Sequence, residues 1–178
     1  AAADLRLGKV TPDSQVAAPA TVTLPGTPHQ LQNYAGESCG NGKVTLTYAF
    51  AESCNTTFAQ LAMNVGEQEL TREAEAWGFN TSSSIPLTVT PSSFPPVKSQ
   101  AELAMAGIGQ PSVRVTPLQM AQVAATEENA GNQMQPYPVK RTLDDKLSVI
   151  STTSQQAARA PITSSVAGQL NTLSIQVV

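Results

Sequence analysis

The region from residue 44 to 78 constrains the fold of this chain most strongly, because helix-forming sequence fills it with only short breaks. Gly66 ends the first helical run and Gly78 ends the second, at the position where glycine commonly follows a helix. We therefore expect residues 44–77 to form one helical unit. The apolar residues expected to face its interior are Phe50, Phe58, Leu61, Leu70 and Trp77.

Three small polar residues, Ser53, Cys54 and Asn55, interrupt this apolar and alanine-rich unit. Serine and asparagine in a helix interior compete for backbone hydrogen bonds, and they favour caps and breaks instead. We expect the interruption to separate two helical turns. Its structural interpretation is an N-cap, with Asn55 starting the second helix.

The composition excludes several classes of function. Charged residues make up 13% of the 178-residue chain, about half of the usual share of ~25%. The net charge is −3, aromatic residues make up only 4%, and the basic residues form no stripe, so nucleic acid binding is not expected. The length predicts one domain with its own core. No stretch reaches the ~20 apolar residues that span a bilayer.

The chain has two cysteines, Cys39 and Cys54, and a single histidine, His29. The cysteine count fits either one disulfide or two reduced thiols. Without a CxxC motif or a second histidine, a cysteine/histidine zinc site is excluded. His29 lies in the turn-rich stretch LPGTPHQLQN, and we expect it in a surface loop.

Turn residues and cap signals divide the rest of the chain into short elements. ATVTLPG, within the Pro- and Gly-rich residues 9–43, alternates like a short strand. Residues 80–99 are an expected extended loop whose apolar side chains are buried: Ile85, Leu87, Val89 and Phe94. The other expected elements are a short helix from about Gln100, a helix capped by Thr116 with Pro117 at N1, a hairpin around Asp144–Lys146, and a last helix capped by Thr163 or Ser164.

Both ends of the chain have helical sequence without the expected terminal signal. AAADLRLG reads as the tail of a helix that closes at Gly8, but no N-cap precedes it. The last helix, in TSSVAGQLNTLSIQVV, has no C-cap. We therefore expect the chain to be a fragment of a longer protein.

Three blocks of sequence, in this order and spacing, resemble the penicillin-binding transpeptidase domain: GKVTLTYAFAESCNTTFAQLAMNVG, LAMAGIGQPSVRVTPLQMAQVAA and QPYPVKRTLDDK. The resemblance covers almost the whole chain and is strongest to class B penicillin-binding proteins of actinobacteria, of the A type. It implies the α/β (α+β) serine D,D-transpeptidase or beta-lactamase-like fold. This chain would carry mainly the helical subdomain with small hairpins, and would lack most of the central sheet. One departure is Asn129-Ala130-Gly131, where the family usually has an Asn-Gly-Gly turn.

The family uses three motifs, Ser-x-x-Lys, Ser-x-Asn and Lys-Thr-Gly, and the chain contains only the second, as Ser53-Cys54-Asn55. No lysine follows a serine by three residues, and none precedes Thr-Gly. In the family, Ser-x-x-Lys begins the helix whose tail resembles AAADLRLG, and Lys-Thr-Gly follows a helix that resembles VAGQLNTLSIQVV. Residues 1–178 are therefore expected to be a partial transpeptidase domain, cut between the two missing motifs and inactive alone.

The resemblance assigns catalytic roles to two residues of the motif. The Ser53 hydroxyl would relay a proton between the family's lysine and the leaving group, and the Asn55 amide would hydrogen-bond the substrate and the same lysine. The parent protein would form an acyl-serine enzyme with the penultimate D-alanine of a peptidoglycan stem peptide and pass the acyl group to an amine. Beta-lactam antibiotics would acylate the same serine. No metal or organic cofactor is expected.

The resemblance also predicts where the parent protein works. It would be extracytoplasmic and held at the cell membrane by an N-terminal anchor that is missing here. Because disulfides persist outside the cytoplasm, we expect Cys39 and Cys54 to form one; two buried thiols are the alternative.

Two other functions compete with a transpeptidase. One is a non-catalytic binding module of the cell envelope that retains the helical lobe. The other is a soluble helical domain in which Ser-x-Asn is only a cap. A Ser-x-x-Lys motif directly upstream of Ala1 in the parent gene would decide for the enzyme.

Overall fold

The computed structural model describes residues 1–40, 42–82 and 85–177. Its helices are α1 (Ala2–Arg6), α2 (Leu46–Ala51), α3 (Asn55–Val65), α4 (Glu67–Ala76), α5 (Gln100–Ala106), α6 (Pro117–Glu128) and α7 (Ser164–Ser174), with a 3-10 helix η1 (Tyr34–Gly36). Its strands are β1 (Gln15–Ala18), β2 (Thr21–Thr23), β3 (Gln30–Gln32), β4 (Gly42–Thr45), β5 (Gln133–Met134), β6 (Arg141–Leu143), β7 (Val149–Thr152) and β8 (Ala157–Arg159).

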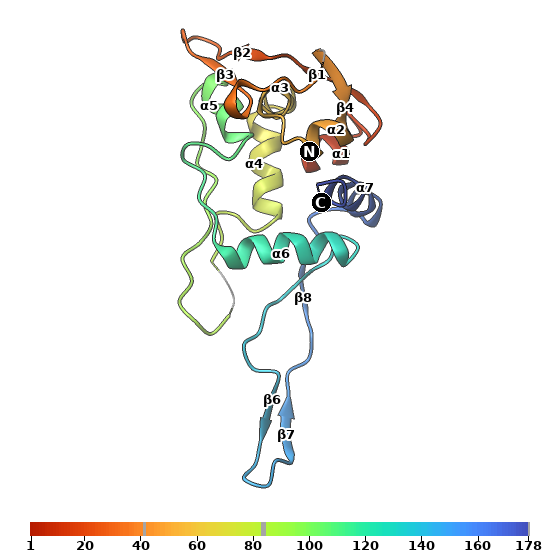
Figure 1. The fold of residues 1–178 in the computed structure, drawn as a ribbon. Helices are drawn as coiled ribbons and strands as arrows, with labels where there is room; N and C mark the ends of the chain where they lie inside the picture. Colours follow the sequence, from red (N-terminus) through yellow and green to blue (C-terminus); the bar gives the residue numbers. More distant parts are fainter. Residues whose placement is uncertain (41, 83–84, 178) are drawn as a thin grey trace.

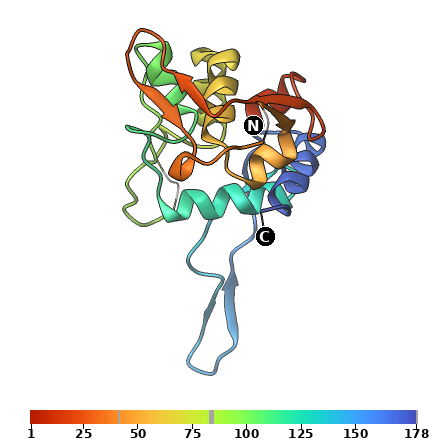
Figure 2. The same ribbon diagram turned by 45° about the horizontal axis from the view of Figure 1, so that its top comes forward.

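The strands of the described residues form four separate antiparallel pairs, β1–β4, β2–β3, β5–β8 and β6–β7. The helices gather in one body, with α4 above α6 in the view of Figure 1. The β6–β7 hairpin projects away from that body, as both ribbon views show (Figures 1 and 2). The fold is therefore a helical body with small two-stranded sheets around it, and these elements position any functional site.

The predicted helical unit is confirmed in α2, α3 and α4, which follow one another with the expected breaks. Thr45 caps α2, because its hydroxyl oxygen accepts a hydrogen bond from the Tyr48 amide at 3.1 Å. The unit begins two residues later than expected, since the strand β4 occupies positions 42–45 before the cap. Gly66 ends α3 with a φ of 91°, a conformation that favours glycine.

The interior of this unit is built mainly from the predicted residues. Leu61 and Trp77 are buried, and they join a core that also contains Leu170 and Leu173 of α7. The rings of Phe50 and Phe58 pack edge to face, with centroids 6.0 Å apart, and lie partly buried against that core. Leu70 is only half-buried.

Close packing of α5 on α3 depends on Gly107, the residue that ends α5. A Cβ at this position would collide with the Cβ of Ala62 and approach the Phe58 carbonyl oxygen to 3.2 Å. The glycine therefore lets the two backbones lie closer than any larger residue would allow.

Helix α6 buries polar side chains and exposes apolar ones, although Val123 packs against the core. It buries Gln119 and Thr126, whereas Met120 is 50% exposed and Ala121 and Ala124 also face solvent. The buried Gln119 amide donates to the Trp77 carbonyl oxygen at 2.8 Å, so the polar face is satisfied from within. The apolar outer face has no such explanation within the described residues.

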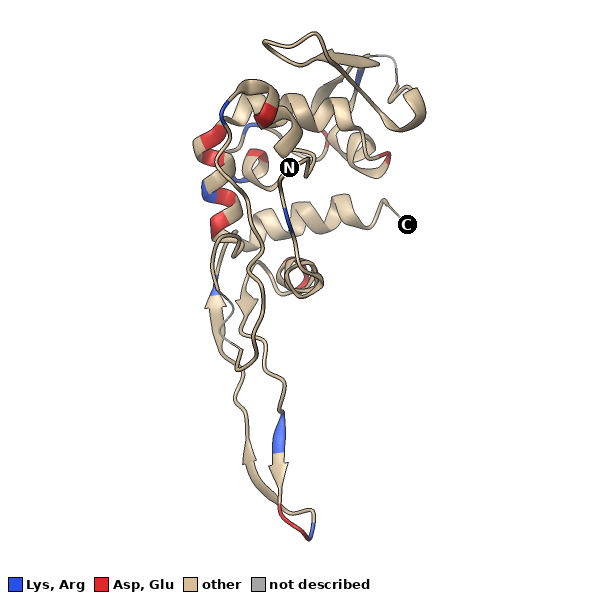
Figure 3. Ribbon diagram, turned by 90° about the vertical axis from the view of Figure 1, so that its left-hand side faces the viewer, with Lys and Arg blue, Asp and Glu red and all other residues tan. Residues whose placement is uncertain are grey.

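The remaining elements agree largely with the sequence. Ser99, Thr116 and Thr163 cap α5, α6 and α7, and the predicted hairpin around Asp144–Lys146 is β6–β7. His29 is exposed in the turn between β2 and β3. Charged side chains concentrate on α4, and Lys and Arg lie scattered over the rest of the described chain (Figure 3).

The predicted loop 80–99 buries fewer apolar side chains than expected. Phe94 is buried, and Ile85 and Val89 are half-buried, but Leu87 is 62% exposed, so its predicted burial is wrong. The Asn80 side chain bonds the backbone of Phe94 through two hydrogen bonds of 2.9 Å, which fixes only the ends of the loop. Ser83 and Ser84, within the predicted loop, lie outside the described residues.

Replacing Leu61 with Ala is expected to lower the free energy of unfolding of the parent domain by about 2–5 kcal/mol. Leu61 is 8% exposed and contacts the shared core, so the substitution leaves a cavity that the surrounding side chains fill only partly. Denaturant unfolding would measure the change, with Asn64→Ala on the exposed face of α3 as the control. An equal midpoint for Leu61→Ala and the unmutated domain would contradict the assigned inward face.

Candidate functional site

The connection between α2 and α3 presents Ser53 in an unusual backbone conformation. The φ of Ser53 is 53°, in the left-handed region that residues other than glycine rarely adopt. The turn is closed on either side, because the Ser53 amide donates to the Phe50 carbonyl oxygen at 3.1 Å and the Cys54 amide to that of Ala49 at 2.9 Å. A strained residue held by its neighbours is a feature that clusters at functional sites. The Ser53 side chain is exposed here.

The start of α3 differs from the structural interpretation of the sequence, because Cys54 is the N-cap and Asn55 is the first helical residue. Cys54 makes no side-chain cap hydrogen bond, since its sulfur is joined to Cys39. The cap comes from Asn33, whose Oδ1 accepts from the Thr56 amide at 3.0 Å. The Asn55 side chain therefore does not cap α3. Its half-buried side-chain amide donates to the Gln32 carbonyl oxygen at 3.4 Å.

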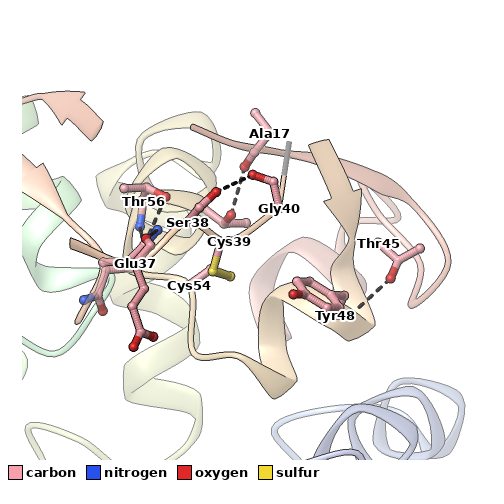
Figure 4. Close-up of a disulfide and its surroundings, with 12 residues drawn as sticks. Ala17, Glu37, Ser38, Cys39, Gly40, Thr45, Tyr48, Cys54 and Thr56 are labelled. Carbon is pink, nitrogen blue, oxygen red and sulfur yellow. Dashed lines mark hydrogen bonds between the residues drawn. A yellow bond between two sulfur atoms is a disulfide. The ribbon is translucent and has the colours of Figure 1, made fainter. Parts of the chain in front are cut away.

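A disulfide joins Cys39 to Cys54, with Cα atoms 5.9 Å apart, inside the limit of ~7 Å for such bonds. Both residues are buried. Figure 4 shows the bond between the irregular segment around Ser38 and the start of α3. The bond therefore fixes the middle residue of the Ser-Cys-Asn motif from the side.

The structure places the predicted site residues together at one turn, but it supplies no activating base for a serine there. Among the described residues, no lysine amine hydrogen-bonds to Ser53 or Asn55; the Lys9 amine, for example, donates to the Asn64 carbonyl oxygen. An unassisted serine hydroxyl is a weak nucleophile. Ser53 and Asn55 can therefore donate and accept hydrogen bonds, but no lysine of the described residues is bonded to Ser53 to activate its hydroxyl as a nucleophile.

The chain shows no sign of a metal site in the part that the structure describes, where no three His, Cys, Asp or Glu side chains converge. Within that same part, none of the helices has both the length and the apolar character that crossing a membrane requires. The carboxylates with shifted pKa values lie elsewhere. The Arg6 guanidinium lowers the pKa of Glu69, and burial raises the pKa of Glu127.

Two residues of this site, Asn33 and Thr56, were not predicted from the sequence. Asn33 precedes Tyr34-Ala35-Gly36, which is typical of a turn, and nothing in that pattern indicates a partner 23 positions away. Thr56 is fully buried and resembles ordinary helix sequence. A pairing between segments so far apart depends on the fold, and local sequence does not encode it.

Replacing Cys39 with Ser is expected to lower the free energy of unfolding of the parent domain by about 3 kcal/mol, the chain-entropy value for a loop of this length. The two cysteines are 15 positions apart, and the bond restricts the unfolded chain. Thermal unfolding with and without a thiol reductant would measure it, and the variant should no longer respond to reductant. A melting temperature that reductant leaves unchanged in the unmutated protein would contradict the prediction.

The sequence of the chain is similar to those of known proteins. A family model, the penicillin binding protein transpeptidase domain, matches residues 1–178. The chain is 40% identical over 176 residues to the peptidoglycan D,D-transpeptidase PbpA of Mycolicibacterium smegmatis, covering 98% of this chain and 36% of that protein. The corresponding PbpA of Mycobacterium tuberculosis is 39% identical over the same shares.

Solved structures are similar as well. The crystal structure of PBPA from M. tuberculosis superimposes with a TM-score of 0.93 and 39% identity, covering 99% of this chain and 41% of that one. The ceftriaxone acyl-enzyme complex of penicillin-binding protein A from M. tuberculosis has a TM-score of 0.93 and 38% identity, with 99% and 40% covered. This match confirms the predicted fold class. The chain spans about a third of the length of the curated relatives it matches.

Proposed function

Because the chain belongs to the penicillin-binding protein transpeptidase family, we propose that it is part of a peptidoglycan D,D-transpeptidase. The observation that carries the proposal is the strained turn of Ser53, fixed by the disulfide at Cys54 and followed by an Asn55 that caps nothing. The matched relatives bear the name peptidoglycan D,D-transpeptidase, and they support the substrate class.

The proposed reaction needs a nucleophilic serine and a lysine from the parent protein outside this chain. The serine oxygen bonds to the carbonyl carbon of the penultimate D-alanine, and the bond from that carbon to the nitrogen of the terminal D-alanine breaks. The proton leaving the serine passes by way of the lysine and the Ser53 hydroxyl to the departing amine. The nitrogen of an amine on a neighbouring stem peptide then bonds to the same carbonyl carbon, the bond from that carbon to the serine oxygen breaks, and the proton lost by the amine returns to the serine oxygen, which completes the cross-link.

In this reaction Asn55 orients the substrate. Its amide has two N–H donors and an acceptor oxygen, and within the described residues one donor is used, at 3.4 Å from the Gln32 carbonyl oxygen. The second N–H and Oδ1 remain for the substrate and the lysine. A beta-lactam enters the same site as a stem-peptide mimic, and the bound penicillin G and ceftriaxone of the solved relatives support that class of partner.

We further propose that residues 1–178 are a partial domain, completed by other parts of the parent protein. The apolar outer face of α6, with Met120, Ala121 and Ala124, supports this, because a helix that exposes such a face normally packs against another layer. The disulfide supports an extracytoplasmic location, where such bonds persist. A membrane anchor outside this chain would hold the parent at the cell surface.

Labelling with a fluorescent penicillin tests the proposal. The isolated 178-residue chain should remain unlabelled, because no serine in it has a lysine three positions later. The full-length parent should be labelled, and mass spectrometry should locate the adduct on a serine upstream of Ala1. A stoichiometric adduct on the isolated chain would overturn the assignment. A folded parent that takes no label would favour the non-catalytic binding module.

A further inference from the structure

Three consecutive residues at the start of α3 are tied to one distant segment, residues 32–39, which we name the bracket segment. Cys54 is joined to Cys39 by the disulfide. Asn55 donates to the Gln32 carbonyl oxygen, and Thr56 donates to the Asn33 side chain. The bracket segment therefore encloses the end of the helix that carries the Ser-Cys-Asn motif.

Asn33 makes the most specific of these contacts. Its Oδ1 accepts from both the amide and the hydroxyl of Thr56, at 3.0 and 3.2 Å, so both lone pairs are used. Its Nδ2 donates to the Glu37 carbonyl oxygen within the bracket segment at 3.2 Å. Asn33 and Thr56 are both buried, at 7% and 0% exposure, so water cannot replace these bonds.

Asn33 bonds to the backbone of α3, whereas the disulfide and the Gln32 carbonyl oxygen contact only side chains of this segment. The amide of Thr56 is one of the first amides of the helix, which have no partner within it. The disulfide holds only the side chain of Cys54, and the bond from Gln32 reaches only the side chain of Asn55. The direction in which the first turn of α3 leaves the Ser53 turn therefore depends on Asn33.

We propose that Asn33 is a positioning residue for acylation, which caps α3 from the bracket segment and so fixes where Ser53 and Asn55 present their side chains. The inference rests on the proposed function, because it concerns the reaction in which those two residues take part. Asn33 acts through Thr56 and has no contact with the substrate. Losing its side chain should leave α3 docked, since Thr57 holds the helix separately through a 2.9 Å hydrogen bond to the Ala17 carbonyl oxygen.

The test measures acylation of the full-length parent by a fluorescent penicillin over a range of concentrations. For Asn33→Ala, the rate constant at saturating penicillin should fall about 10- to 100-fold, the effect of a small misplacement of catalytic groups. The half-saturating concentration should change little, because Asn33 does not touch the ligand. Asn33→Asp keeps an oxygen that accepts both hydrogens of Thr56, but it replaces the Nδ2 donor to the Glu37 carbonyl with a second acceptor, so its rate should lie between that of Asn33→Ala and the unmutated one.

Asn80→Ala is the matched control. The Asn80 side chain makes a similar two-bond tie to the backbone of Phe94, away from α3, so its loss should leave the acylation rate unchanged. If Asn33→Ala does not fold, Asn33→Ser takes its place, because a serine hydroxyl is one bond too short to reach Thr56, and it should show the same slow rate.

A folded Asn33→Ala or Asn33→Ser protein that acylates at the unmutated rate would overturn the inference, because the bonds from Thr56 to the Asn33 oxygen would then be irrelevant to acylation. Failure of the proposed function has a separate sign in the same assay, which is Ser53→Ala acylating at the unmutated rate.

Discussion

In the full-length parent, replacing Ser53 or Asn55 with Ala is expected to slow acylation by penicillin by about 10²–10⁴-fold, because Ser53→Ala removes a positioned proton-transfer group and Asn55→Ala removes an orienting hydrogen-bond donor. The fold should stay largely intact. Ser53 is exposed and its side chain contributes nothing to the core, and Asn55 loses only the bond of 3.4 Å to Gln32. The rate of formation of the covalent penicillin adduct is the measurement, with the melting temperature recorded alongside.

Ser53→Gly separates the chemistry of the hydroxyl from the strain of the backbone. Glycine adopts a φ of 53° without strain, so this variant should be at least as stable as Ser53→Ala and equally slow in acylation. Ser148→Ala, on the projecting β6–β7 hairpin, is the control serine and should acylate normally. An Asn55→Ala parent that acylates at the unmutated rate would remove the basis for both assigned roles.

The sequence predicted the elements of this fold wherever a local signal ends or begins a helix. Gly66 ends α3, Thr116 with Pro117 begins α6, and Thr163 begins α7, because caps are satisfied by residues a few positions away. The hydrophobic spacing likewise identified Leu61 and Trp77 as core residues. These features need no knowledge of the rest of the molecule.

Features that depend on distant parts of the chain were missed. Asn55 is a residue type that commonly caps helices, but the side chain of Asn33 caps α3 instead. Asn33 lies in a segment that comes close to α3 only in the folded chain. The sequence of α6 does not show which face of the helix is exposed, because apolar residues lie on both faces. The buried side chain of Gln119 is satisfied by its hydrogen bond to the Trp77 carbonyl oxygen. Leu87 is apolar but 62% exposed, in a loop whose ends are joined by the bonds between Asn80 and Phe94.

The structure places the predicted site residues at one turn between α2 and α3, but the conformation of that turn could not be predicted from the sequence. Sequence alone placed Ser53 and Asn55 at a break between helices, and it allowed either a disulfide or two thiols for the cysteines. The left-handed conformation of Ser53 accompanies two backbone hydrogen bonds at the end of α2. The Ser53 amide donates to the Phe50 carbonyl oxygen, and the Cys54 amide donates to that of Ala49. Roles for the two side chains in catalysis stay a prediction.

Replacing Arg6 with Met is expected to lower the free energy of unfolding of the parent domain by about 3–5 kcal/mol, because it leaves a buried carboxylate without its counter-charge. Arg6 of α1 donates to Glu73 at 2.6 Å and to Glu69 at 2.7 Å, both on α4. Glu73 is 5% exposed, and its other oxygen accepts from the Trp77 indole at 2.9 Å. The same change removes both of these ties between α1 and α4.

Arg72→Met is the matched control for this prediction. Arg72 bonds the same Glu69 at 2.6 Å, but its side chain is 67% exposed, so its loss should cost only about 0–1 kcal/mol. Adding Glu73→Gln to Arg6→Met should restore much of the stability, since the amide oxygen still accepts from Trp77 and no buried charge remains. Denaturant unfolding of the four proteins at neutral pH gives the comparison.

The effect of Arg6→Met should also depend on pH in a defined direction. The Arg6 guanidinium, by hydrogen bonding, lowers the pKa of Glu69 below its ordinary value of 4.5. A carboxylate with a lowered pKa in the folded state contributes stability that is present above its unfolded pKa and is lost as the pH falls through the folded value. The gap between the unmutated and Arg6→Met proteins should therefore narrow as the pH falls below the usual carboxyl range. A gap that stays constant as the pH falls through that range and well below it, or an Arg6→Met protein no less stable than Arg72→Met, would show that the tie between α1 and α4 is not electrostatic.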